Sequence, residues 1–74
     1  MDKAKAQEHL AEADNQIREA KAKIAAQRER IVQLAADGHP IEEAEKLLAN
    51  YIKLLRTMEQ HRAIIQKEVK ENKA

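Results

Sequence analysis

The chain has 74 residues, of which 36% are charged, and a formal net charge of +1. It contains no cysteine, which excludes disulfides, thiolate metal sites and a cysteine nucleophile. One tyrosine is its only aromatic residue, so a core must be built from Ile, Leu, Val, Met and Ala. We therefore expect one small domain that needs a further source of stability, and oligomerisation is the remaining route.

The first half of the chain carries a seven-residue repeat of apolar residues. One set is spaced seven apart and consists of Leu10, Ile17, Ile24 and Ile31. A second set falls between them at alternating steps of three and four, and consists of Ala6, Ala13, Ala20, Gln27 and Leu34. This heptad pattern is typical of a long helix that packs along another long helix. We predict a helix over about residues 3–36.

The only glycine and the only proline divide the chain almost at its midpoint. Gly38 can adopt the left-handed conformation that ends a helix. Pro40 suits the first turn of the helix that follows, where three glutamates favour the positive end of the helix dipole. We predict a tight turn over residues 37–40 and a second helix over about 41–72, so that residues 1–74 form a single helical hairpin.

The second half continues the seven-residue repeat on two stripes. One stripe is Ile41, Leu48, Leu55, Arg62 and Val69, and the other is Ala44, Tyr51, Met58 and Ile65. When the chain folds back at the turn, a single register sets the stripes of the two halves opposite each other: Leu34 meets Ile41, Gln27 meets Leu48, and Ala13 meets Arg62. The sequence therefore predicts an all-α fold, a two-helix antiparallel hairpin resembling a coiled coil.

Two polar residues interrupt these stripes. Gln27 either sets the register as a buried polar residue or faces water at the edge of the seam, and the sequence leaves both readings open. Arg62 is expected to extend its charged group outward over the small Ala13.

Charged residues favour the antiparallel orientation. Residues 1–20 and 37–54 each carry a net charge of −2, whereas residues 21–36 carry +3 and residues 55–74 carry +2. The hairpin therefore sets a positive segment beside a negative one along both halves of its length. Within the helices, the four-residue spacing predicts three ion pairs: Asp14–Arg18, Glu19–Lys23 and Glu42–Lys46.

The second helix is too apolar to be covered by one partner helix. Leu47 and Leu54 lie on one flank and, with Tyr51, would form an exposed apolar ridge, which soluble monomers avoid. We predict a homodimer in which two hairpins pack as a four-helix bundle. Its interface is expected to centre on Leu47, Tyr51, Leu54 and Met58, with Val32 or Ile24 contributing from the first helix. The alternative is a monomer whose ridge is covered by a different protein.

Neither catalysis nor metal binding is predicted. The three histidines, His9, His39 and His61, do not share a helix turn, as helical metal ligands do; His39 is expected to cap or bond locally in the turn. There is no nucleophile with a nearby base and no glycine-rich phosphate loop, so we expect no enzyme activity, cofactor or small-molecule ligand. No apolar run is long enough to span a membrane, and the first residues lack the apolar stretch of a signal peptide. The expected location is the cytoplasm.

Two functions from different classes remain. The first is a non-enzymatic protein–protein interaction or adaptor module that acts as a homodimer. The alternative is a small nucleic-acid-binding helical bundle, suggested by two basic clusters: Lys21, Lys23, Arg28 and Arg30, and Lys67, Lys70 and Lys73. Against it, the net charge is only +1, the first cluster faces the acidic start of the second helix, and no aromatic side chain is left for base stacking.

The chain also resembles a group of small helical-hairpin proteins, of uncharacterised activity, that are found widely in α-proteobacteria. The resemblance covers roughly residues 8–68 and is most specific at the Gly38-His39 turn followed by Ala44-Glu45-Lys46-Leu47-Leu48. It further rests on the run His9-Leu10-Ala11-Glu12-Ala13-Asp14, on Ile17, Ile24, Gln27, Ile31 and Leu34, and on His61-Arg62 before Ile65. Ala20 replaces a glycine that is common in the group, and Ile41 replaces a threonine. The resemblance implies a bacterial cytoplasmic origin and a helical hairpin, and it implies no activity.

Overall fold

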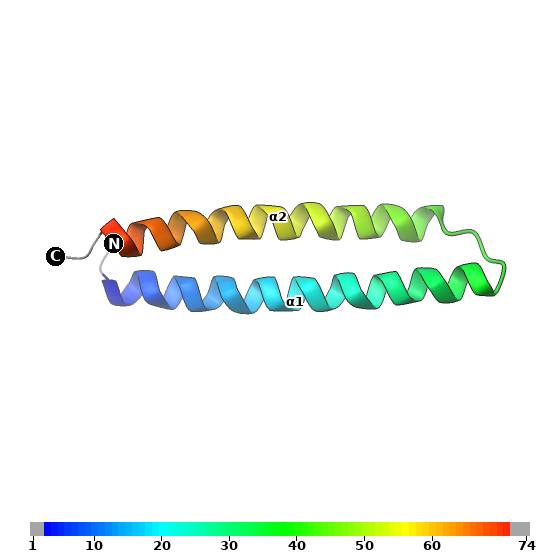
Figure 1. Cartoon of the computed structure of the whole chain (residues 1–74), viewed down its shortest axis with the longest axis horizontal. Coiled ribbons are helices and arrows are strands. Elements are labelled where there is room, and N and C mark those ends of the chain that lie inside the picture. The colour runs from blue at the N-terminus through cyan, green and yellow to red at the C-terminus, as the bar shows by residue number, and fades with distance from the viewer. Residues whose placement is uncertain (1–2, 72–74) are drawn as a thin grey trace.

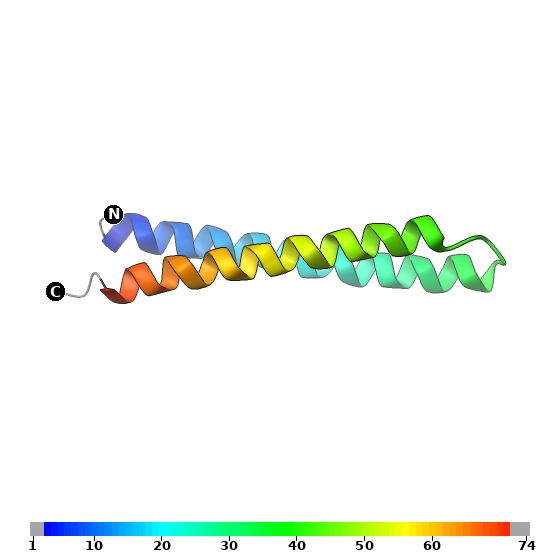
Figure 2. The same ribbon diagram turned by 90° about the horizontal axis from the view of Figure 1, so that it is seen from above.

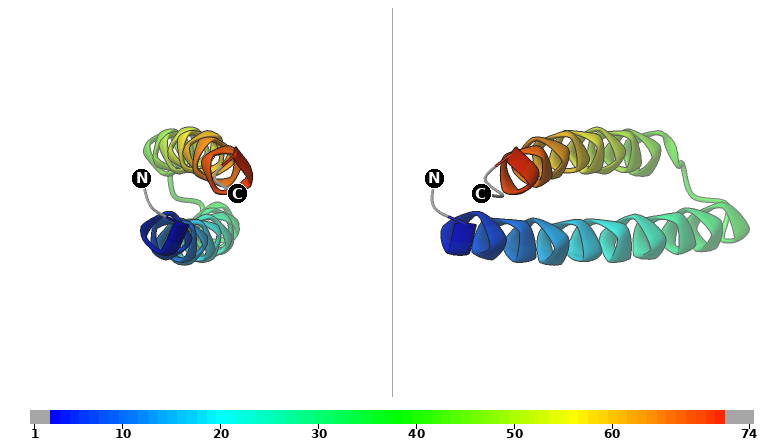
Figure 3. Two further views of the ribbon diagram at one scale, coloured as in Figure 1. Left: turned by 90° about the vertical axis from the view of Figure 1, so that its left-hand side faces the viewer. Right: turned by 60° about the vertical axis from the view of Figure 1, so that its left-hand side comes forward.

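The computed structural model describes residues 3–71, which form two long antiparallel helices (Figure 1). Helix α1 spans Lys3–Ala36 and helix α2 spans Glu42–Glu71. The predicted all-α helical hairpin is thus confirmed, although α2 starts one residue later than expected, and its predicted end near residue 72 lies outside the described residues. The hairpin is 59 Å long and only 14 and 12 Å across. Seen along its axis, it is a single layer of two helices (Figure 3).

The turn closes α1 with a pair of backbone hydrogen bonds around Gly38. This residue has a φ of +76°, in the left-handed region. The His39 N–H donates to the Leu34 carbonyl at 2.9 Å, and the Gly38 N–H donates to the Ala35 carbonyl at 3.1 Å. These bonds form the Schellman motif, which satisfies carbonyls that a helix end leaves without partners. The predicted role of Gly38 is confirmed, and His39 contributes through its backbone.

The start of α2 differs in detail from the prediction. The Glu45 N–H donates to the Ile41 carbonyl at 2.9 Å, which makes Ile41 the N-cap residue. The expectation that Pro40 lies in the first turn of α2 is therefore wrong, because Pro40 precedes the N-cap. Three glutamates do occupy that first turn, at the positive end of the helix dipole.

The core is the narrow seam between the two helices, which cross at a shallow angle (Figure 2). Seven of the described residues are buried, and all seven lie on the predicted stripes: Ala6, Ala13, Ile17, Ala20, Ile24, Gln27 and Ile65. The remaining stripe residues are half-buried. Because the alanines along α1 have small side chains, the seam buries little apolar surface and on its own contributes little stability.

Gln27 is buried in this seam and is 7% exposed. Its Nε2 donates to the Ala44 carbonyl at 2.9 Å. That carbonyl oxygen is also the helical acceptor for the N–H of Leu48, the residue predicted to lie opposite Gln27. Of the two readings that the sequence left open, the buried one holds, and its hydrogen bond agrees with the predicted register.

The ion pairs and side-chain hydrogen bonds of the charged residues differ from those predicted. Asp14 forms an ion pair with Arg62 across the seam, while Arg18 donates to Asn15 at 2.9 Å. Lys46 pairs with Glu43 at 3.6 Å rather than with Glu42. Arg62 also donates to Gln66 at 2.9 Å, so its charged group turns along the seam edge instead of extending freely into water.

Of the ion pairs among residues 3–71, only Asp14–Arg62 joins the two helices. The basic cluster of α1 therefore makes no ion pair with the acidic start of α2. Charge complementarity of the two segments contributes at most through longer-range attraction.

Candidate interaction surface

One broad side of the hairpin exposes large apolar side chains of α2. Leu47 is 41% exposed, Leu54 50% and Ile64 58%, and all three project from the same edge of the helix because they are spaced by seven and ten residues. Tyr51 and Met58 are half-buried and line a groove together with Leu54. We call these five residues (Leu47, Tyr51, Leu54, Met58 and Ile64) the apolar face.

Two shallow grooves run end to end along this face. The first has a volume of about 270 Å³ and lies between Leu54 of α2 and Lys23 of α1. The second, of about 310 Å³, lies under Ile64 of α2 and beside Glu12 of α1. Gln16 lines both grooves, so they form one continuous concave strip. An open strip of this shape fits an elongated helical partner better than a compact ligand.

The structure brings together four of the six residues predicted at the interface. Leu47, Tyr51, Leu54 and Met58 share the apolar face, as their spacing requires. Ile24 is only 6% exposed inside the seam, so it presents little surface to a second copy, and its contribution to the interface stays a prediction.

Val32 is 67% exposed but does not belong to the apolar face. It occupies the same heptad position as Ala25, which lines a groove on the opposite side of the hairpin with Ile52 and Arg28. Val32 therefore lies on the other side of the hairpin from the apolar face, and its contribution to an interface stays a prediction. Ile64 does belong to the apolar face, although the predicted ridge does not include it. Its spacing of ten residues from Leu54, nearly three helical turns, is the signal in the sequence that indicates this.

Charged residues of α1 border the apolar face in a defined order. Glu12 and Glu19 come first, Lys23 follows, and all three line the grooves. Arg30 occupies the heptad position of Lys23 one repeat further on. Within residues 3–71, none of these four side chains makes an ion pair or a side-chain hydrogen bond, including the predicted Glu19–Lys23 pair. Between positions 12 and 30, this edge of α1 changes from acidic to basic.

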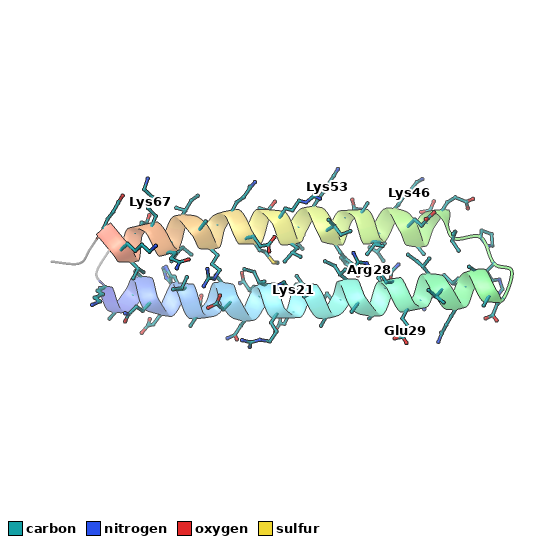
Figure 4. All side chains as sticks on the ribbon, viewed as in Figure 1. Lys21, Arg28, Glu29, Lys46, Lys53 and Lys67 are labelled. Carbon is teal, nitrogen blue, oxygen red and sulfur yellow. The ribbon has the colours of Figure 1, made fainter. Side chains whose placement is uncertain are left out.

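The opposite broad side carries cations instead. Lys21, Arg28 and Arg56 line a groove of about 360 Å³ there, above the apolar Ile52 and Leu55. We call Lys21, Arg28 and Arg56 the basic face; none of them forms an ion pair with another described residue. In Figure 4, Lys21 and Arg28 lie along the side of α1 next to α2, whereas Glu29 points away from it.

The outer edge of α2 is also cationic. Figure 4 shows Lys46, Lys53 and Lys67 projecting from the side of α2 that faces away from α1. Two of these lysines pair with glutamates of their own helix, at 3.6 Å for Lys46 and 3.9 Å for Lys67. This edge is a solvated surface.

Four potential metal ligands line the groove under Ile64: His9, Glu12, His61 and Glu68. Even so, no three His, Asp or Glu side chains in the described part of the chain lie close enough to hold one metal ion. Neither described helix is long and apolar enough to cross a membrane.

Compared with known families, curated proteins and solved structures, the chain matches no protein family and has no significant match to a curated protein or a solved structure. The resemblance to the α-proteobacterial hairpin group therefore stays a prediction. Function has to be argued from the two faces of the hairpin.

Proposed function

We propose that this protein is a non-enzymatic protein-interaction module that self-associates through its apolar face. Two hairpins laid face to face would form a four-helix bundle, the arrangement that buries one apolar side of each helix pair. The exposure of Leu47, Leu54 and Ile64 on one face carries this proposal. Full burial of a Leu or Ile side chain contributes roughly 1.5–3 kcal/mol, so three half-exposed side chains on each copy are a substantial driving force.

The small amount of apolar surface buried in the seam supports the same proposal. Among residues 3–71, only three large apolar side chains are buried: Ile17, Ile24 and Ile65. As many large side chains are exposed on the apolar face as are buried in the seam. A second layer would convert the apolar face into core, and the charged outer edges would remain to present a helical surface to another protein. We place this module in the cytoplasm, as its sequence predicts.

The test is the mass of the protein in solution. At micromolar concentration, sedimentation equilibrium should give twice the 8.5 kDa chain mass. Leu54→Glu should reduce the mass to that of one chain, because it buries a charge at the centre of the interface. Val32→Glu is the control, since it changes an apolar residue on the other side that is even more exposed than Leu54, 67% against 50%, and it should leave the dimer intact. A single-chain mass for the unmodified protein would refute the proposal.

The basic face supports a second candidate, the nucleic-acid-binding bundle. Three cations without ion-pair partners line one groove, which is the electrostatic footprint of a phosphate-binding surface. Fluorescence anisotropy with a single-stranded RNA should then show binding that weakens as salt rises, and Arg28→Glu should abolish it. Lys53→Glu, on the outer edge of α2, is the control. Binding that is equally sensitive to both changes would point to non-specific charge attraction.

A further inference from the structure

We propose that the two copies pack with their turns at opposite ends, about a two-fold axis at the level of Leu54. This inference rests on the proposed self-association and specifies its geometry. Leu54 of one copy would pack on Leu54 of the other, and the charged edge of α1 would pair with the same edge of the second copy.

The position of the apolar side chains decides which helices face each other. With both turns at the same end, a two-fold axis along the hairpin lays α2 of one copy over α1 of the other. Leu47 and Leu54 would then meet a charged edge. With the turns at opposite ends, α2 lies over α2, and the exposed leucines of one copy meet the apolar face of the other. Burial of apolar surface against apolar surface favours this second arrangement.

The order of charges along α1 fits the same arrangement. In the antiparallel arrangement α1 lies over α1 of the second copy. A residue a given number of positions before the axis then lies opposite the residue the same number of positions after the axis in the second copy. Glu19 and Lys23 are both two residues from position 21, and Glu12 and Arg30 are both nine residues from it. An axis at this level sets Glu19 opposite Lys23 and Glu12 opposite Arg30, twice each. Exposed pairs of this kind add little affinity, but they select one orientation over others.

The charge pattern and the apolar face give the same centre independently. Leu54 lines its groove together with Ala20 and Lys23, which places it at the level of position 21 of α1. It is also the middle member of the exposed series Leu47, Leu54 and Ile64. The axis that pairs the charges is therefore the axis that stacks the central leucine on itself.

The absence of cysteine from the chain allows a clean test by cross-linking. A disulfide requires Cβ atoms about 3.5–4.5 Å apart, so only a residue next to the axis can bond to its own copy. Leu54→Cys should give a disulfide-linked dimer under mild oxidation. Leu47→Cys is the matched control: it lies seven residues away, so the two copies of this position are separated by about 20 Å and should not cross-link.

Charge reversal tests the orientation without altering the apolar face. Glu19→Lys and Lys23→Glu should each raise the dimer dissociation constant several-fold. The double variant E19K/K23E should restore it, because the swapped charges again face opposite charges across the axis. Glu19 and Lys23 are also four residues apart in one helix, so the swap could restore a local pair as well. The same swap at Glu12 and Arg30 separates the two explanations, because these residues are 18 positions apart in α1. Glu12→Lys and Arg30→Glu should each weaken the dimer, and E12K/R30E should restore it.

The outcomes separate this inference from the proposal on which it rests. A dimeric mass with no Leu54→Cys cross-link and no rescue by E19K/K23E would overturn the antiparallel geometry and leave self-association standing. A single-chain mass at every concentration would overturn self-association itself. Cross-linking at Leu54, with rescue by the charge swap, supports both.

Discussion

Gly38 combines a φ of +76° with empty space around its Cβ position, because no atom lies within 4 Å of it. The added methyl group of Gly38→Ala therefore contacts no neighbouring atom. The substitution should destabilise the fold by about 1–2 kcal/mol, because alanine disfavours the left-handed backbone conformation. We expect a lower urea midpoint with an unchanged m-value at fixed protein concentration. Gly38→Asn should lose less stability than Gly38→Ala, since asparagine tolerates this conformation better than alanine does. Equal stability of all three proteins would contradict the role of this residue in the turn.

Gln27 is the second residue whose environment makes a sharp prediction. The Ala44 carbonyl keeps its helical hydrogen bond without Gln27, so Gln27→Leu leaves no buried acceptor without a donor. We expect stability within about 1 kcal/mol of the unmodified protein, or above it. Gln27→Glu sets a carboxylate against that carbonyl at 7% exposure and should destabilise by about 2 kcal/mol or more at neutral pH. Urea unfolding measures both, and a destabilising Gln27→Leu would show that the hydrogen bond itself is a major contribution.

At the scale of the helices, Asp14 and Arg62 form the ion pair that links α1 to α2 in the described chain. Their side chains are 43% and 33% exposed, so solvent screens the pair and its coupling should be modest, about 0.5–1 kcal/mol. A double-mutant cycle of Asp14→Ala and Arg62→Ala, measured by thermal unfolding, gives this coupling directly. It should shrink when salt is raised to 1 M. The Lys67–Glu71 pair within α2 is the control, with a coupling below that of the cross-helix pair.

The heptad repeat was sufficient to predict both helices and the seam between them. All seven buried residues lie on its stripes because a helix can bury only the residues that recur every three or four positions. The apolar stripes alone do not say on which flank of the seam an outward residue lies, which follows from its heptad position only once the two helices are paired. The stripes therefore group Val32 with Leu47 although the two residues face opposite sides, and they leave Ile64 outside the face that it shares with Leu54.

The ion pairs were less predictable for a different reason. A lysine such as Lys46 reaches glutamates three and four residues before it, and the free energies of the two contacts differ by less than thermal energy. Asp14 had a partner within its own helix in Arg18 and a second one across the seam in Arg62. Only the structure of the packed hairpin shows that Arg62 lies close enough to Asp14 to form the ion pair.

For the whole molecule, the proposed dimer makes unfolding depend on protein concentration. If two hairpins fold and associate in one step, a tenfold dilution lowers the free energy of unfolding by about 1.4 kcal/mol, and the melting temperature falls with it. Circular dichroism over a hundredfold range of concentration should record this shift. Leu54→Glu should have a melting temperature that does not change with concentration. A concentration-independent transition in the unmodified protein would mean that the hairpin is stable alone.

The start of α1 and the end of α2 lie at the same end of the hairpin, and the turn lies at the far end of the 59 Å rod (Figure 1). Tension applied between these ends would pull at right angles to the seam. The contacts between α1 and α2 would then break one after another along the seam, beginning near Ala6 and finishing at the Gly38 turn. Each thin layer would bear the load alone, so one hairpin should unzip at low force, whereas a rod pulled along its length would share the load over the whole seam.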